Sequence, residues 1–584
     1  MTNSRLLLLF TATATLGGCR PVASTATTPV LPVPGPEVRP AEFPPGWRVG
    51  ADRRAVTAPH AMIVSNSALA SEAGLSILRQ GGNAVDAAVA TGFALAVTYP
   101  QAGNIGGGGF MVIRMADGRS AAIDYREIAP LAATRNMYLD AQGRLTDRSR
   151  IGALAAGVPG AVAGMAAALE KYGTMSLAQV VTPAIRLAAD GFVVDSALSG
   201  AIGGASKLIS RYEGAAVFLP GGKAPAPGDT LRQPALARTL RFIAEHGVAG
   251  FYSGPVADSI AAEQRRDGGI ITTRDLAAYR AVWREPVRGT YRGDTLLSMP
   301  PSSSGGITAI ESLNILETWP ELPRFGSAEY YHDLAESFRR AFIDRNTKLG
   351  DPAFVSVPMA HLTSKRYADS LRATIVPGRA SVTPTFNPGK ESMQTTHYSV
   401  VDARGNAVST TTTLNGWFGG GAYVAGAGFF LNNEMDDFAA QPGVPNMFGL
   451  VQGEANAIAP GKRMLSSMTP TIVIGGDGRV RLVVGAAGGP TITTATVQII
   501  VNMIDSHMSL ADAMSAPRIH EQAWPDRVTY EEGGIAPVVL DSLRAMGYTL
   551  EAVPRIANAN AVARVAGGWQ GMVEPRATGG AAGY

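Results

Sequence analysis

The stretch Gln394-Thr395-Thr396-His397-Tyr398-Ser399 decides the fold of this chain. It follows a loop, 377–393, that is rich in proline, glycine and polar residues, and it opens a run of β-forming residues. Residues 396–401 and 407–414 predict a β-hairpin. If the chain were cut before Thr395, that threonine would carry both a hydroxyl and a free α-amine. An α-amine has an ordinary pKa of about 7.7–8.0, so it can act as a base near neutral pH.

A terminal threonine of this kind needs no histidine to activate its hydroxyl. The seven histidines of the chain are indeed scattered, and they form neither an HExxH pair nor a close cluster that would indicate zinc: His60, His246, His332, His361, His397, His507 and His520. The sequence also has no GxSxG, SxxK or P-loop motif. Spacing alone leaves two interpretations of Thr395 open, a nucleophile or an ordinary strand residue.

The composition describes a chain with a large core and little charge. Of 584 residues, 46% are hydrophobic and 17% charged, which excludes a disordered protein. The net charge of +3 is too balanced to suggest a nucleic-acid partner. The only cysteine is Cys19, so the chain cannot form an internal disulfide, a four-cysteine zinc site or an iron–sulfur cluster.

The N-terminus has the features of a secretion signal, which we predict over residues 1–18. Arg5 precedes a short apolar run and a stretch of small residues. The run is shorter than the roughly 20 apolar residues of a membrane span. Its end, Leu16-Gly17-Gly18-Cys19, resembles a bacterial lipobox and predicts a lipid on Cys19. The alternative is an ordinary signal peptide in which the cysteine is incidental.

A proline-rich tether is predicted to follow the lipidated cysteine, over residues 19–54. Eight prolines between residues 20 and 45 favour an extended, semi-rigid segment. We therefore expect an exported protein, periplasmic or anchored in a membrane through its lipid alone. Arg20 after the cysteine, instead of aspartate, slightly favours the outer membrane.

The body of the chain mixes helical and strand patterns, which indicates a layered α/β or α+β fold. Residues 151–169 carry no charge, but alanine and glycine insert weakly into membranes, so we expect a buried helix there. A second strand pair is predicted at 468–474 and 480–485. The other predicted helices cover residues 70–79, 83–97, 328–340, 493–503 and 510–516.

From about Ala55 to Tyr584 the chain resembles the γ-glutamyltranspeptidases, a branch of the N-terminal nucleophile hydrolases. The motifs that carry the resemblance are 81–88 (GGNAVDAA), 105–110 (IGGGGF), 124–127 (DYRE), 394–399 (QTTHYS), 431–438 (LNNEMDDF), 442–446 (PGVPN), 465–468 (LSSM) and 582–584 (AGY). The resemblance implies an α+β fold, a four-layer αββα sandwich formed jointly by a large subunit (55–394) and a small subunit (395–584). It implies no metal and no organic cofactor.

The resemblance also assigns roles to residues. Thr395 matches the nucleophile, which also cleaves the Gln394–Thr395 bond, and Thr413 matches the hydroxyl beside it. The remaining matches are Gly488 and Gly489 for the oxyanion hole, Arg126, Ser466 and Ser467 for the substrate α-carboxylate, Asn415, Glu434 and Asp437 for its α-ammonium, Phe448 for the lid, and Arg576 for support near the site. A guanidinium suits a carboxylate, and a buried ammonium needs carboxylates.

The expected function is a γ-glutamyltransferase and hydrolase acting on glutathione and related γ-glutamyl amides. A γ-glutamyl ester of Thr395 would pass to water or to an amino acid or peptide acceptor. One alternative is an N-terminal nucleophile acylase of the cephalosporin-acylase type, although a glutaryl group has no ammonium for Glu434 and Asp437. Another is a non-catalytic surface lipoprotein that serves as a scaffold.

Two positions depart from the family pattern. Phe448 stands where tyrosine is usual in the lid, and it has no hydroxyl to donate. Pro490 follows the glycine pair where serine is common, and it has no N–H. Both departures leave the balance between transfer and hydrolysis open.

Overall fold

A computed structural model describes residues 38–47, 49, 54–383 and 395–584. The predicted signal peptide, Cys19, the first part of the tether and Gln394 lie outside these residues. The described part of the tether contacts the body of the protein. The backbone N–H of Arg39 donates to the carbonyl of His507 at 2.8 Å, and Trp47 Nε1 donates to the carbonyl of Ser515 at 2.9 Å. The body therefore begins earlier than the predicted residue 55.

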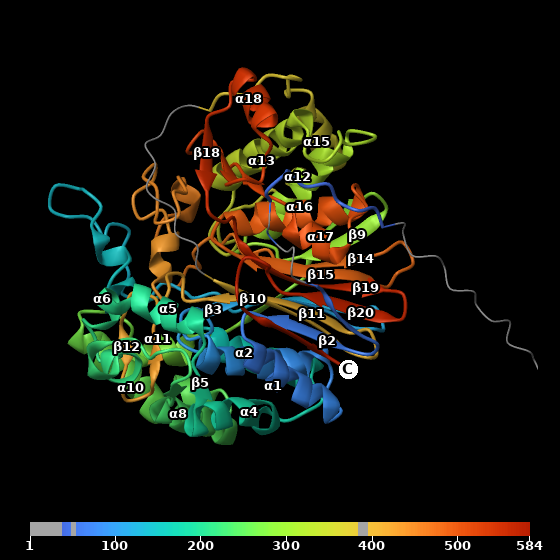
Figure 1. The fold of residues 1–584 in the computed structure, drawn as a ribbon. Coiled ribbons are helices and arrows are strands. Elements are labelled where there is room, and N and C mark those ends of the chain that lie inside the picture. Colours follow the sequence, from blue (N-terminus) through green and yellow to red (C-terminus); the bar gives the residue numbers. More distant parts are fainter. Residues whose placement is uncertain (1–37, 48, 50–53, 384–394) are drawn as a thin grey trace, which may run out of the picture. The chain divides into compact units, whose positions relative to one another are not determined.

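Two seven-stranded antiparallel sheets form the centre of the protein (Figure 1). The first sheet has the order β21 (Gly580–Gly583), β2 (Met62–Ser65), β10 (Thr396–Val401), β11 (Ala407–Thr413), β3 (Gly108–Arg114), β4 (Ser120–Asp124) and β7 (Val282–Arg284). The second has the order β1 (Val56–Ala58), β20 (Gly568–Met572), β19 (Asn558–Val565), β15 (Val480–Ala487), β14 (Thr471–Ile474), β9 (Asp294–Ser298) and β8 (Val287–Tyr291).

The two sheets pack face to face between helices. Strands β10 and β11 lie against β15, and hydroxyl groups bridge the sheets where Ser409 Oγ donates to the carbonyl of Val484 at 3.2 Å. Helices α1 (Ala68–Arg79) and α2 (Ala84–Thr98) cover the first sheet, and α12 (Gly305–Glu317) and α16 (Thr491–Ile504) cover the second (Figure 1). This arrangement confirms the predicted α+β class and its αββα layers.

Each sheet mixes strands from both sides of residue 395. In the first sheet, β10 and β11 lie between β2 and β3, which come from the N-terminal part. In the second sheet, β14, β15, β19 and β20 lie between β1 and β9. A cut before Thr395 would therefore leave two chains that share both sheets.

The polar sequence around Asn83 explains the start of α2. The Asn83 side chain accepts hydrogen bonds from the backbone N–H groups of Val85 and Asp86, and the Asp86 carboxylate accepts one from the N–H of Asn83. This capping box satisfies the first N–H groups of a helix that is buried along its whole length. The structure thus confirms the predicted helices at 70–79 and 83–97, with Asn83 as the cap.

The predicted helix over 151–169 is only half right. A short 3-10 turn, η2 (Ala153–Ala155), is followed by Pro159 and Gly160, and α3 (Ala161–Tyr172) begins only after them. Proline lacks the N–H that a helix interior requires, so the uncharged stretch is divided there. Within the described residues, no helix is both long enough and apolar enough to cross a membrane.

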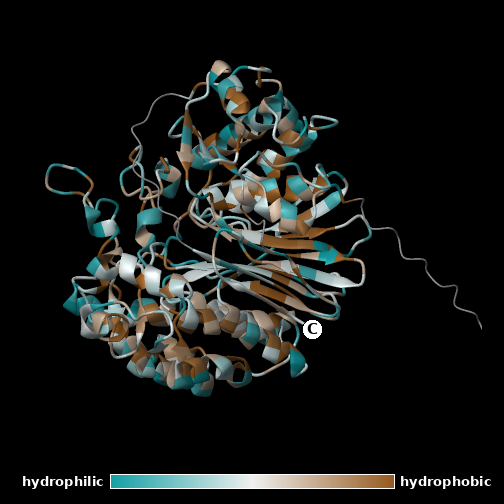
Figure 2. Ribbon diagram, viewed as in Figure 1, coloured by the Kyte–Doolittle hydropathy of each residue, from teal (hydrophilic) through white to brown (hydrophobic). Residues whose placement is uncertain are grey.

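Hydrophobic residues, brown in Figure 2, recur along the strands of both sheets and along the helices that cover them. One apolar cluster joins α1, α2 and the first sheet, and the other fills the space around the second sheet, α12 and α13 (Ala328–Lys348). Further helices surround this core: α4 (Leu177–Asp190), α5 (Ser196–Gly204), α8 (Pro234–His246), α10 (Gly254–Arg266), α15 (Lys365–Arg372), α17 (Leu510–Ser515) and α18 (Pro537–Ala545).

Candidate active site

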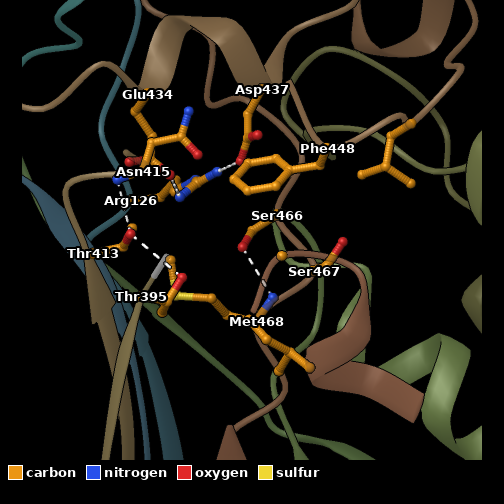
Figure 3. A pocket seen from close by; sticks show the side chains of 13 residues that line it. Arg126, Thr395, Thr413, Asn415, Glu434, Asp437, Phe448, Ser466, Ser467 and Met468 are labelled. Atoms are coloured by element: carbon orange, nitrogen blue, oxygen red, sulfur yellow. Dashed lines mark hydrogen bonds and ion pairs between the residues drawn. The ribbon is translucent and has the colours of Figure 1, made fainter. Parts of the chain in front are cut away.

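A small cavity of about 20 Å³ lies where β10, β11 and the turn between β15 and α16 meet. Most of the predicted site residues line it (Figure 3). The lining consists of Arg126, Thr395, Thr413, Asn415, Glu434, Asp437, Phe448, Leu450, Ser466, Ser467, Met468, Gly489 and Ile492. Segments more than 300 residues apart in the sequence therefore converge on one point.

Thr395 lies directly before β10, and the pairing of the two hairpin strands places it beside Thr413. Thr396 pairs with Thr412 in the antiparallel register. The two hydroxyl oxygens, Thr395 Oγ and Thr413 Oγ, are 3.5 Å apart. Thr413 Oγ also accepts a hydrogen bond from the N–H of Asn415 at 2.8 Å. The Thr413 proton therefore remains available for donation to Thr395 Oγ.

The glycine pair forms a tight turn between β15 and α16. Gly488 and Gly489 have φ values of 138° and 58°, which disfavour residues with a side chain. A Cβ at Gly489 would lie 2.7 Å from the ring of Phe448. Pro490 occupies the start of α16 with φ of −64°, where its missing N–H is tolerated. Gly489 is among the residues that line the cavity, and Gly488, the residue before it, is not.

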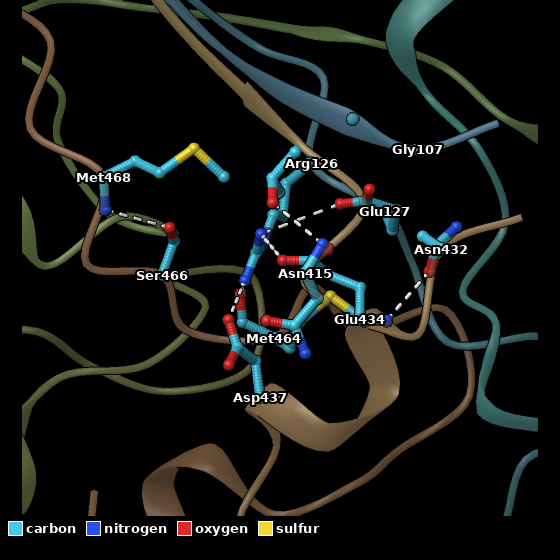
Figure 4. A network of polar contacts seen from close by, with 12 residues as sticks. Gly107, Arg126, Glu127, Asn415, Asn432, Glu434, Asp437, Met464, Ser466 and Met468 are labelled. Atoms are coloured by element: carbon cyan, nitrogen blue, oxygen red, sulfur yellow. Dashed lines mark hydrogen bonds and ion pairs between the residues drawn. The ribbon is translucent and has the colours of Figure 1, made fainter. Parts of the chain in front are cut away.

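Arg126 also lines the cavity, and it forms the centre of a buried charge cluster (Figure 4). Its guanidinium makes ion pairs with Glu434 and Asp437, and Nε donates to the carbonyl of Met464 at 3.3 Å. A third carboxylate, Glu127, lies 3.8 Å from Arg126 Nη1. The Arg126 guanidinium thus lies among three carboxyl groups.

Burial controls the protonation of this cluster. Desolvation disfavours the charged form of a carboxyl group and raises the pKa of Glu434 and of Asp437, although Arg126 opposes the shift. The same effect raises the pKa of Glu127 to about 7. Burial also disfavours the charge of Arg126, but the carboxylates of Glu434 and Asp437 outweigh it and raise the pKa of Arg126.

Asparagine side chains fix the acidic turn η4 (Glu434–Asp437). Asn432 accepts a hydrogen bond from the N–H of Glu434 at 3.0 Å and donates to the carbonyls of Gly106 and Gly157. Asn415 Nδ2 donates to the carbonyl of Asn433 at 3.0 Å. Asn432 therefore connects the turn to the loops of Gly106 and Gly157, and Asn415 connects it to the segment after β11.

Ser466 and Ser467 lie on the loop before β14, across the cavity from Thr413 (Figure 3). Ser466 Oγ accepts from the N–H of Met468 at 3.0 Å. Ser467 Oγ accepts from Arg345 Nη2 at 3.2 Å. Arg345 is not among the residues that the sequence predicted.

Phe448 and Arg576 differ in their relation to the cavity. Phe448 lines it and packs with Phe342 and Leu450 in a small apolar cluster. Arg576 lies away from the lining, where it makes ion pairs with Glu531 and Glu574. Three apolar lining residues were not among the predicted site residues, although Met468 belongs to the LSSM motif and Leu450 and Ile492 lie a few residues from other predicted segments.

His397 is the histidine nearest to Thr395 in sequence, and its side chain is fully buried. Burial lowers the pKa of His397 to about 3, so the ring is neutral. Its Nδ1 is 2.8 Å from Thr411 Oγ, and its Nε2 is 3.1 Å from Ser399 Oγ. The ring lies between the sheets and does not line the cavity.

A threonine before a central strand of an αββα sandwich, with a second hydroxyl and a glycine turn beside it, defines the N-terminal nucleophile hydrolases as the class of this protein. The family model described as "Gamma-glutamyltranspeptidase" matches residues 70–584. The chain belongs to the gamma-glutamyltranspeptidase family.

The relatives include hydrolases and acylases. The chain is 50% identical to a "Glutathione hydrolase proenzyme" of Escherichia coli (strain K12), over 84% of this chain and 86% of that protein. It is 41% identical to the "Acylase ACY 1 proenzyme" of Pseudomonas sp. (strain SE83), over 91% and 93% of the two chains. A solved cephalosporin acylase from Bacillus halodurans superposes with a TM-score of 0.81 at 29% identity, over 95% and 99%.

Proposed function

We propose that this protein is an autoprocessed γ-glutamyltransferase and hydrolase that uses Thr395 as its nucleophile. The observation that carries the proposal is the cavity itself. A threonine hydroxyl, a buried arginine and two buried carboxylates line the same cavity. A γ-glutamyl group presents the matching features, a reactive carbonyl at one end and an α-carboxylate and an α-ammonium at the other.

The charges of the cavity can exchange partners when this substrate enters. Arg126 pairs with Glu434 and Asp437 in the structure. The substrate carboxylate would replace them on Arg126, aided by the hydroxyls of Ser466 and Ser467. The substrate ammonium would then pair with the carboxylates of Glu434 and Asp437. Each buried charge keeps an opposite charge throughout, which avoids the large cost of an unpaired buried ion.

We propose a bond-breaking step that uses Thr395, Thr413 and the glycine turn. The α-amine of a processed Thr395 takes the proton of Thr395 Oγ, which attacks the γ-carbonyl. The N–H groups of Gly488 and Gly489 stabilise the resulting oxyanion, and loss of one such donor typically costs about 2.7–4 kcal/mol. The amine leaves with the proton, and a γ-glutamyl ester of Thr395 remains. Water or an amine acceptor then resolves the ester.

Processing would use the same hydroxyl before any substrate is bound. Attack of Thr395 Oγ on the carbonyl of Gln394 converts that peptide bond into an ester and frees the α-amine. Hydrolysis of the ester yields a large chain that ends at Gln394 and a small chain that begins at Thr395. The interleaved sheets would hold the two chains together as a heterodimer.

Two donor classes fit the family, and the charged residues favour one of them. The E. coli relative is named a glutathione hydrolase, and the Pseudomonas relative an acylase. A glutaryl group would leave Glu434 and Asp437 without a cation to replace Arg126. We therefore propose glutathione and related γ-glutamyl amides as donors, with water, amino acids or short peptides as acceptors.

We further propose that the enzyme is exported and held at a membrane by a lipid on Cys19, with the outer membrane slightly favoured. The support is the sequence that ends in Leu16-Gly17-Gly18-Cys19. Labelled fatty acid should be incorporated into the wild-type protein but not into Cys19→Ser. Equal labelling of the two would refute the anchor.

A γ-glutamyl-anilide assay with and without glycylglycine tests the proposed activity on protein whose chain masses are known. Two chains, anilide release and faster release with glycylglycine support a transferase. Release without any effect of glycylglycine supports a hydrolase. A single unsplit chain without activity would support the scaffold. If Thr395→Ala protein still splits, the proposed mechanism is wrong.

A further inference from the structure

Arg345 is a buried cation that the proposed mechanism does not yet use. It lies in the last turn of α13 and is 1% exposed. Among the residues that the structure describes, no ion pair to a carboxylate is recorded for it, and burial lowers the pKa of Arg345 to about 10. A buried cation is costly unless it is satisfied by hydrogen bonds.

Four oxygen atoms surround the Arg345 guanidinium, and three of them come from segments that frame the cavity. Nη1 donates to Gln452 Oε1 at 2.9 Å, Nη2 to Ser467 Oγ at 3.2 Å, and Nε to Ser304 Oγ at 3.3 Å. The fourth, Asn346 Oδ1, is the neighbouring side chain at 3.0 Å. The guanidinium thus joins α13 to three separate loops.

Two of these partners reach the walls of the cavity in turn. Ser304 Oγ donates to the carbonyl of Ser466 at 2.6 Å. Gln452 Nε2 donates to the carbonyl of Asp437 at 3.1 Å. Arg345 is therefore fixed between the loop of Ser466 and Ser467 and the acidic turn of Asp437.

The hydrogen bond to Ser467 has a directional consequence. Arginine has only donors, so Ser467 Oγ must accept from it. The Ser467 proton then has to point elsewhere, and Ser467 lines the cavity. The positive charge behind the hydroxyl also makes this proton a stronger donor, because hydrogen bonds polarise one another along a chain.

We propose that Arg345 is a positioning residue that commits the Ser467 hydroxyl to donate a hydrogen bond to the α-carboxylate of the substrate. This inference rests on the proposed function of the cavity. It assigns to Arg345 a selective role, because a donor that lacks the α-carboxylate would gain nothing from the oriented hydroxyl.

The test compares γ-glutamyl-anilide with 4-aminobutyryl-anilide, which keeps the ammonium and lacks the α-carboxylate. Arg345→Met should raise KM for γ-glutamyl-anilide by about tenfold, the value of roughly one hydrogen bond to a charged group, with little change in kcat. KM for 4-aminobutyryl-anilide should stay the same. Ser467→Ala should reproduce this pattern, and the double variant should be no worse than either single variant.

Arg340→Met is the matched control, because Arg340 lies on the same helix but pairs with Glu336 and does not line the cavity. It should leave the ratio of the two KM values unchanged. If Arg345→Met fails to fold, the same cycle with Arg345→Lys applies. Its rise in KM should vanish in the Ser467→Ala background.

Equal effects of Arg345→Met on both anilides, or effects of Arg345 and Ser467 that add fully, would overturn the inference. Failure of the proposed function would look different. In that case the wild-type enzyme itself would not prefer γ-glutamyl-anilide to 4-aminobutyryl-anilide.

Discussion

Replacement of Asp437 by asparagine tests whether the acidic turn holds the α-ammonium of the donor. The substitution keeps the shape of the side chain and removes one buried charge. Asp437 is 8% exposed, lines the cavity and pairs with Arg126. A hydrogen bond to a charged group contributes about 1.5–3 kcal/mol. Since about 1.36 kcal/mol is tenfold in rate, kcat/KM for γ-glutamyl-anilide should fall by about 10- to 150-fold.

Glutaryl-anilide supplies the comparison, because it keeps the carboxylate of the γ-glutamyl group and lacks the ammonium. Asp437→Asn should not lower kcat/KM for this compound. A rise is expected if anything changes, because Arg126 loses a carboxylate that competes with the substrate. Initial rates of anilide release give kcat/KM for each compound, and the test is the ratio of the two kcat/KM values.

Asp436→Asn is the control for this experiment. Asp436 lies in the same turn and is also buried, but it accepts hydrogen bonds from Ser149 Oγ and from the N–H of Met447 and does not line the cavity. Its replacement should leave the ratio of kcat/KM for γ-glutamyl-anilide to kcat/KM for glutaryl-anilide unchanged. Equal losses on both anilides in Asp437→Asn, or no loss on γ-glutamyl-anilide, would refute the assignment of Asp437 to the ammonium.

Three further predictions follow from the same geometry. Thr413→Val should lower kcat by about tenfold or more, because it removes the hydroxyl beside the nucleophile and leaves the buried N–H of Asn415 unpaired. Thr413→Ser should retain most activity in the same assay. Acidification should raise KM for γ-glutamyl-anilide but not for glutaryl-anilide, because burial raises the pKa of Glu434 and Asp437 and their protonated forms cannot hold an ammonium. Parallel KM profiles for the two compounds would contradict this. Gly489→Ala should lower the free energy of unfolding by about 1–3 kcal/mol and reduce kcat, because a φ of 58° strains alanine and the added Cβ would meet the ring of Phe448. An unchanged Tm and an unchanged kcat would show that the turn tolerates a side chain.

The parts of the fold that the sequence predicted well are those with local signals. The hairpin after Thr395 follows from two runs of β-forming residues on either side of a turn, and both of its strands are present in the structure. The helix over 151–169 was predicted too long, because the absence of charge hid the interruption at Pro159. In α13 the prediction stopped at Arg340, whereas the helix continues to Lys348.

The site could be predicted as a set of residues but not as a set of contacts. Motifs identified Arg126, Glu434 and Asp437 separately, but their mutual ion pairs depend on how distant segments pack. Arg345 carried no signal, because an arginine near the end of a polar helix is usually exposed. Its burial becomes visible only when α13 lies against the loops of Gln452 and Ser467.

The most direct measurement of the central claim is the mass of the enzyme trapped during turnover. Rapid acid quenching of the wild-type protein with γ-glutamyl-anilide, followed by mass spectrometry, should show two chains with the small one beginning at Thr395. One γ-glutamyl group should be bound to the peptide that contains Thr395 for as long as the sample is kept acidic, because the protonated α-amine cannot then take the acyl group from the hydroxyl. An active enzyme that stays unsplit, or that carries the γ-glutamyl group on another residue, would contradict the account.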